Sequence, residues 1–137
     1  MYKKIIVSLS LNHGIGAKAI EVARSLRIKG GEIIAVHVYE PLQGSVSTYV
    51  SKEDVANSVQ KAEADLAKRI GTAMDVEAVM LMGHSGRAIT DYAKKIEADC
   101  IVVGSHKPGL SDHFLGSTAS RVVRHAPCSV HVLRKAE

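Results

Sequence analysis

The sequence predicts an α/β protein with a five-stranded parallel sheet and helices on both faces. Short runs of aliphatic and β-branched residues alternate with longer segments whose apolar residues recur at helical spacing. Each of the first four runs is followed by such a segment, which gives the order βαβαβαβαβ. This alternation is typical of parallel sheets, and right-handed crossovers restrict their connections. We therefore expect one domain over residues 1–137 with strand order 3-2-1-4-5.

The predicted strands are mostly apolar along their whole length, as expected for strands buried between two helix layers. The first includes Ile5, Ile6 and Val7 and follows the N-terminus directly. Turn residues close the third and fourth strands at Gly83–Gly86 and at Gly104-Ser105. The strands are expected over Lys3–Leu9, Glu32–Val38, Val76–Met82, Asp99–Val103 and Ser129–Leu133.

Four helices are predicted between these strands. A glycine stop at Lys29–Gly31 is expected to end the first helix. The second begins with Ser51–Asp54, which resembles a capping box, and ends at Gly71. The fourth spans Ala119–His125 and is stopped by Pro127. The apolar stripes of the first three are Ile15, Ala19, Val22, Ala23 and Leu26; Val55, Val59, Ala62, Leu66 and Ile70; and Ile89, Tyr92, Ala93 and Ile96.

Composition excludes several classes of function. The chain is 46% hydrophobic and 23% charged, which indicates a globular protein. A net charge of +4 and an aromatic fraction of 4% supply neither the basic surface nor the stacking platforms of a nucleic-acid-binding protein. No apolar run is long enough to span a bilayer, and no signal-peptide pattern is present. We expect a cytoplasmic protein that binds no nucleic acid and has no membrane span.

The reactive side chains form no recognisable catalytic or metal-binding pattern. Cys100 and Cys128 adjoin predicted buried strands without CxxC spacing, and we expect free thiols. The seven histidines show neither HxxxH nor HxH spacing. In the loop after the fourth strand, no spacing pairs a nucleophile with a base. The polar candidates there are His106, Lys107, Asp112 and His113. No catalytic residue and no metal site is predicted.

The most informative stretch joins the fourth predicted strand to the fourth helix. Gly116, Ser117 and Thr118 open that helix, and first-turn N–H groups lack intrahelical partners and carry partial positive charge. Gly116 permits close approach and the hydroxyls add donors, which suits a phosphate, although an ordinary helix cap has the same pattern. In a 3-2-1-4-5 sheet, ligands bind between strands one and four, where Ser8–His13 and Gly104–Gly116 meet. That position favours a nucleotide-sized ligand.

The chain resembles the universal stress protein family over essentially its whole length. The strongest similarity is in LGSTASRVVRHAPCSVHVLR, which is similar to the family's closing helix and last strand. The segments MYKKIIVSLS and IIAVHV are similar to the family's first two strands. The segment GHSGRAITDYAKKIEADCIVVGSH is similar to the family's third helix and fourth strand. The resemblance implies a single-domain flavodoxin-like or Rossmann-like fold and a homodimer that pairs through strand five. It also implies binding of ATP, AMP or ADP, with or without Mg²⁺.

Many members of this family bind ATP or AMP with the loop G-x2-G-x9-G-[ST]. Gly104, Gly116 and Ser117 match, whereas Lys107 replaces the second glycine and the loop is one residue shorter. The S-H-K-P segment at 105–108 resembles a bacterial subgroup with S-H-[RK]-P, which is also associated with ATP. Where the family has Pro-x-Asp, this chain has Ser8-Leu9-Ser10. These departures bear on affinity and nucleotide choice rather than on the fold.

The resemblance also implies roles for individual positions. Adenine would lie near Ser8, Ser10 and Val38. Ribose and the first phosphate would lie near Val103, Gly104 and His106. The outer phosphates would lie near Gly116, Ser117 and Thr118, and Lys107 would balance their charge. The leading function is a dimeric, nucleotide-binding stress sensor or regulator with an unknown protein partner and at most slow, incidental ATP hydrolysis. A nucleotide-free dimeric scaffold is the alternative, since Ser10 lacks a carboxylate. Adenylyl transfer is third, because HGIG at 13–16 is only a scrambled HIGH motif.

Overall fold

The computed structural model describes residues 1–10, 16–41, 51–105 and 115–134, and the predicted architecture is confirmed within them. One sheet has the order β3-β2-β1-β4-β5, and each neighbouring pair of strands is parallel. The elements are β1 (Tyr2–Ser8), α1 (Gly16–Leu26), β2 (Arg27–Tyr39), α2 (Lys52–Ile70), β3 (Val76–Met82), α3 (Ser85–Lys95), β4 (Cys100–Gly104), α4 (Ser117–His125) and β5 (Ser129–Leu133).

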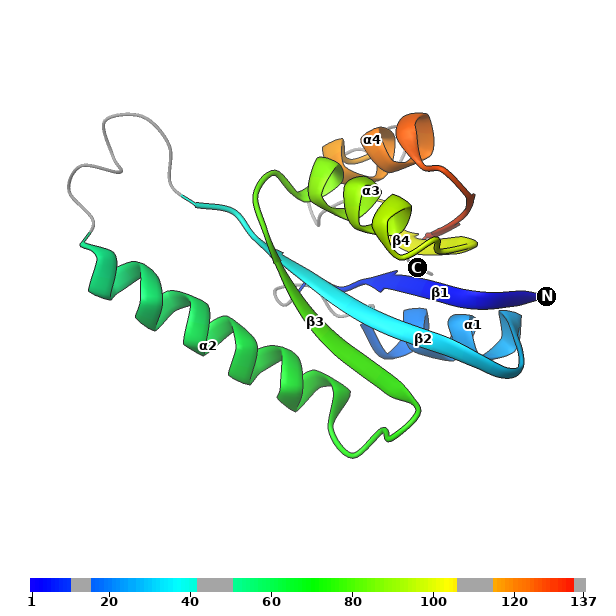
Figure 1. Cartoon of the computed structure of the whole chain (residues 1–137), viewed down its shortest axis with the longest axis horizontal. Coiled ribbons are helices and arrows are strands. Elements are labelled where there is room, and N and C mark those ends of the chain that lie inside the picture. The colour runs from blue at the N-terminus through cyan, green and yellow to red at the C-terminus, as the bar shows by residue number, and fades with distance from the viewer. Residues whose placement is uncertain (11–15, 42–50, 106–114, 135–137) are drawn as a thin grey trace.

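Helices cover both faces of the sheet, as predicted (Figure 1). On one face, α1 and α2 enclose a cluster that includes Ile5, Ile33 and Val102. On the other face, α3 and α4 enclose a cluster that includes Ile6 and Ile101. Because neighbouring residues of a strand point to opposite faces, the continuous apolar runs supply both clusters at once. The sheet is therefore buried along its central strands.

The predicted glycine stop of the first helix is wrong. Helix α1 already ends at Leu26, and β2 begins at Arg27. The pairing of β1 with β2 shifts register between its first two matched positions, so the extra residues of β2 are accommodated as a bulge. Gly30 has φ 80°, and a Cβ on Gly31 would lie 2.9 Å from the carbonyl oxygen of Lys3. These glycines serve strand pairing, which helical periodicity alone does not reveal.

Charged contacts hold the amino end of the sheet together. Both carboxylate oxygens of Asp99 accept hydrogen bonds, from the backbone N–H groups of Lys3 and Lys4, at 2.8 Å each. Asp75, just before β3, accepts from Arg24 at 2.9 and 2.8 Å and from Arg27 at 3.2 Å. The hydrogen bond from Arg24 is the main cause that lowers the pKa of Asp75 to about 2. These contacts lie at the end of the sheet opposite the predicted ligand site.

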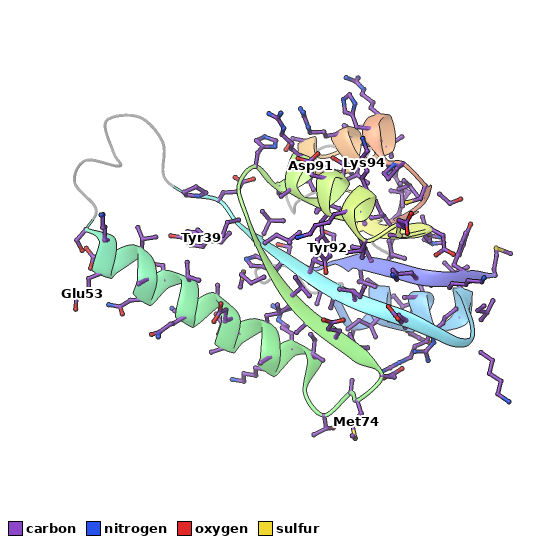
Figure 2. All side chains as sticks on the ribbon, viewed as in Figure 1. Tyr39, Glu53, Met74, Asp91, Tyr92 and Lys94 are labelled. Carbon is purple, nitrogen blue, oxygen red and sulfur yellow. The ribbon has the colours of Figure 1, made fainter. Side chains whose placement is uncertain are left out.

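Helix α2 begins as predicted, because the Ser51 hydroxyl accepts from the backbone N–H of Asp54 at 3.0 Å. Gly71 closes it with φ 61° and an N–H donated to the Ala67 carbonyl. Only Leu66 of this helix is buried, and the start of the helix lies far from the sheet, with Glu53 at its distal end (Figure 2). Its apolar stripe is thus covered mainly toward its C-terminal end. None of the described helices is long and apolar enough to cross a membrane.

The two cysteines are free, as predicted, and they lie on opposite faces of the sheet. Cys100 is buried in the cluster under α1 and α2, whereas Cys128 packs against the cluster under α3 and α4. Burial is the main cause that raises the pKa of the Cys100 thiol to about 11. It also raises the pKa of the Cys128 thiol. Both thiols are therefore protonated at neutral pH, and their placement on opposite faces opposes a disulfide between them.

Candidate nucleotide site

The chain order reverses between β1 and β4, and this creates the switch point of the sheet. Register pairs Ile6 with Ile101 and Val7 with Val102, so Ser8 and Val103 come next along the two strands. Val103 belongs to the cluster under α3 and α4, and alternation places Ser8 on the same face. Ser8 and Val103, at the carboxyl ends of β1 and β4, therefore face the side of the sheet that α3 and α4 cover.

The end of β1 is tied to β2 by contacts from two neighbouring residues. The backbone N–H of Leu9 donates to the Val36 carbonyl at 2.8 Å. The Nδ1 atom of His37 lies 3.0 Å from the Leu9 carbonyl, which requires the proton on Nδ1. Ser8 is half-buried and Ser10 is exposed on either side of this anchor. Ser8 and Ser10, the predicted adenine contacts, are consequently held at the carboxyl end of β1.

The start of α4 is fastened to the end of β4. The Gly116 N–H donates to the Ser105 carbonyl at 2.7 Å, and the Ser105 N–H donates to the Leu133 carbonyl at 3.0 Å. Ser105 is 2% exposed, so this junction is part of the core. Helix α4 starts two residues before its predicted start, and its N-cap is Gly116, which has no side chain to cap the following N–H groups. Among the described residues, no N-cap side chain therefore satisfies the first-turn N–H groups, an arrangement that suits an anion.

Helix α3 begins beside α4, and a hydrogen bond between side chains links the two starts. The hydroxyls of Ser85 and Thr118 are 2.9 Å apart. The Ser85 backbone N–H donates to Oε1 of Glu40 at 2.8 Å. The Gly83 N–H donates to the Tyr39 carbonyl at 3.0 Å, which holds the ends of β2 and β3 together. Glu40 and Ser85 were not predicted as site residues, although each closely follows the carboxyl end of a strand.

A close approach of α3 to α4 depends on Gly86. A Cβ at this position would lie 2.8 Å from both Cβ and Cδ of Arg121. The aliphatic part of the Arg121 side chain therefore occupies the space that a larger residue would fill. Nε of Arg121 is buried without a hydrogen-bond partner among the described residues. Figure 2 shows that Tyr92, farther along α3, lies toward the sheet, whereas Asp91 and Lys94 lie on the outer side.

Most predicted site residues lie in one region, at the carboxyl ends of β1, β2 and β4 and the start of α4. They are Ser8, Ser10, Val38, Val103, Gly104, Gly116, Ser117 and Thr118. His106 and Lys107 lie outside the described residues, as does most of the S-H-K-P segment. Among the residues that are described, no group of three or more His, Cys, Asp or Glu side chains is arranged to hold a metal ion.

The fold and this region define a doubly wound α/β protein with a glycine-capped helix start at its switch point. The model of the universal stress protein family matches residues 1–134. The chain belongs to the universal stress protein family. Its similarity to universal stress protein G of Salmonella typhimurium is 29% identity, covering 98% of this chain and 100% of that protein. A universal stress protein of Thermus aquaticus is 30% identical, with the same coverage.

Solved structures share the fold. The protein MJ0577 superimposes with a TM-score of 0.81 at 22% identity and covers 100% of this chain and 99% of its own. A family member from Arabidopsis thaliana was solved with AMP, with TM-score 0.62, 19% identity and coverage of 98% and 92%. Another universal stress protein was solved with cAMP, with TM-score 0.63, 20% identity and coverage of 98% of each chain. The Archaeoglobus fulgidus protein was solved with dAMP, with TM-score 0.57, 22% identity and coverage of 96% and 97%.

Proposed function

We propose that this protein binds an adenine nucleotide, ATP or its products AMP and ADP, at the switch point between β1 and β4. The observation that carries the proposal is the glycine-capped start of α4, which the bond from Gly116 to Ser105 holds at the end of β4. The AMP, cAMP and dAMP found with three proteins of this fold give the same ligand class. The backbone N–H groups and hydroxyls of Ser117 and Thr118 would donate to phosphate.

The other ligand contacts follow from the positions of the strand ends. Adenine would rest against Val38, with the hydroxyls of Ser8 and Ser10 as hydrogen-bonding groups. Ribose would lie near Val103 and Gly104, and His106 and Lys107 would complete the site from the loop that follows. Mg²⁺ would accompany a bound triphosphate. We propose a binding protein rather than an enzyme, with at most slow, incidental hydrolysis, that acts as a cytoplasmic stress sensor or regulator through a protein partner.

Titration of the purified protein with AMP, ADP and ATP tests this proposal. We expect micromolar binding by calorimetry, and nucleotide released on heating the protein as purified. Ser117→Ala should weaken binding by about 1 kcal/mol, because one hydroxyl hydrogen bond is lost while the backbone donors remain. Ser58→Ala on the exposed surface of α2 serves as the control. Millimolar or absent binding to the unaltered protein would support the nucleotide-free scaffold instead.

We further propose a homodimer formed along the edge strand β5. The Leu133 carbonyl accepts from Ser105 and therefore points toward β4. Because backbone groups alternate sides along a strand, those of Val130 and Val132 point toward the open edge. Val123 of α4, which is 48% exposed, adds apolar surface. Antiparallel pairing with a second copy would satisfy the outward groups about a two-fold axis.

Val132→Pro is expected to shift the protein from dimer to monomer in sedimentation at tens of micromolar. Proline removes an outward N–H donor but leaves the groups that bond to β4 in place. Val132→Ala keeps that donor and should remain dimeric, which separates lost pairing from lost side-chain volume. Circular dichroism of each variant verifies the fold. Monomeric behaviour of the unaltered protein at this concentration would reject the dimer.

A further inference from the structure

Two hydrogen bonds connect an acidic side chain to the start of α4. Glu40, which follows Tyr39 at the carboxyl end of β2 (Figure 2), accepts from the Ser85 N–H at 2.8 Å. The Ser85 hydroxyl lies 2.9 Å from the Thr118 hydroxyl. The chain of contacts thus runs from the residue after β2 to the first turns of α3 and α4. The bond from Gly83 to Tyr39, at 3.0 Å, holds the segments that carry Glu40 and Ser85 against each other.

This connection has two consequences at the start of α4. If the Thr118 hydroxyl donates to a bound phosphate, its oxygen can accept from the Ser85 hydroxyl. The two hydroxyls then form a hydrogen-bonded chain that ends on the ligand. The carboxylate of Glu40 already occupies the start of α3, where a second anion would otherwise find donors. The start of α3 therefore already holds a carboxylate, and Ser85 links that carboxylate to the start of α4.

We propose that Glu40 is a specificity-determining residue that biases the site toward nucleotides with little phosphate charge, AMP over ATP. The inference rests on the proposed nucleotide binding and adds to it the class of ligand. A triphosphate brings more negative charge than a monophosphate to the region of Thr118, and its repulsion by Glu40 is correspondingly greater. Arg121, whose side chain packs against Gly86 of α3, has the same charge for both ligands.

The decisive comparison is Glu40→Gln, measured by calorimetry with AMP and with ATP. Glutamine retains an oxygen that accepts from the Ser85 N–H but removes the charge. We expect the ratio of the ATP dissociation constant to the AMP dissociation constant to fall by about threefold to tenfold at low salt, as a screened charge at an exposed position allows. The change should shrink in 0.5 M salt, because the screening length there is only roughly a quarter to half a nanometre.

Two control variants separate charge from structure. Glu63→Gln, on the exposed surface of α2, makes the same change in net charge far from the site and should leave the ratio unaltered. Ser85→Ala keeps Glu40 but removes the hydroxyl, and it should weaken AMP and ATP binding to a similar extent. A purely structural role for Glu40 as a cap of α3 would change thermal stability and both dissociation constants together, without changing their ratio.

The outcomes distinguish this inference from the proposed function. If the unaltered protein binds AMP and ATP and Glu40→Gln leaves the ratio within error, the specificity role is overturned and nucleotide binding stands. If the unaltered protein binds no adenine nucleotide, the proposed function fails and the role of Glu40 fails with it. A ratio that falls for Glu40→Gln, but not for Glu63→Gln, supports the inference.

Discussion

Gly116→Val is expected to weaken nucleotide binding severely while leaving the fold intact. Gly116 has φ −62° and ψ 161°, an extended conformation that valine adopts without strain. Its side chain would project where a phosphate has to approach the first turn of α4. Loss of two or more hydrogen bonds to a charged group weakens binding on the order of a hundredfold or more. Calorimetry with AMP and ATP measures the effect.

The melting temperature without nucleotide provides the control for this variant. It should stay close to that of the unaltered protein, because the N–H of residue 116 still donates to the Ser105 carbonyl. Gly116→Ala, with a smaller side chain, should give an intermediate affinity. Full nucleotide affinity in Gly116→Val would mean that the phosphate does not contact the start of α4, and the proposed site would have to be abandoned.

Gly86→Val is expected to lower the free energy of unfolding by about 1–3 kcal/mol, the usual cost of overfilling a packed contact. Its Cβ would lie 2.8 Å from Arg121, which is closer than van der Waals contact permits. Relief requires α3 to move away from α4, and that movement would stretch the hydrogen bond between Ser85 and Thr118. Nucleotide affinity should therefore fall together with stability. Urea denaturation and calorimetry measure the two effects.

Arg87→Val is the matched control, because it places the same β-branched residue in the first turn of α3 at an exposed position. It should cost much less stability than Gly86→Val. In a double-mutant cycle, Arg121→Ala should restore part of the loss, since it removes the Cγ and Cδ contacts but leaves the Cβ. Strictly additive effects of the two substitutions would show that the close contact with Arg121 is not what makes glycine necessary.

The sequence by itself determined the fold class, because its signals are local and repeated. Apolar runs such as Ile5–Val7 and helical stripes alternate in a way that few other architectures permit. The hydroxyl of Ser51 and the start of α2 were likewise predictable from a four-residue pattern. The region of the proposed site was predicted by the same reasoning, since parallel sheets bind ligands at the carboxyl ends of their strands.

Tertiary structure decided the features that depend on strand pairing and helix packing. Gly30 and Gly31 look like a helix stop in the sequence, but the register of β1 against β2 places them in a strand bulge. The pairing of Glu40 with Ser85 spans 45 positions, and that of Ser85 with Thr118 spans 33. Nothing in the residues between these positions specifies which side chains will meet. Their contact arises only when the sheet order brings β2, α3 and α4 to the same end of the molecule.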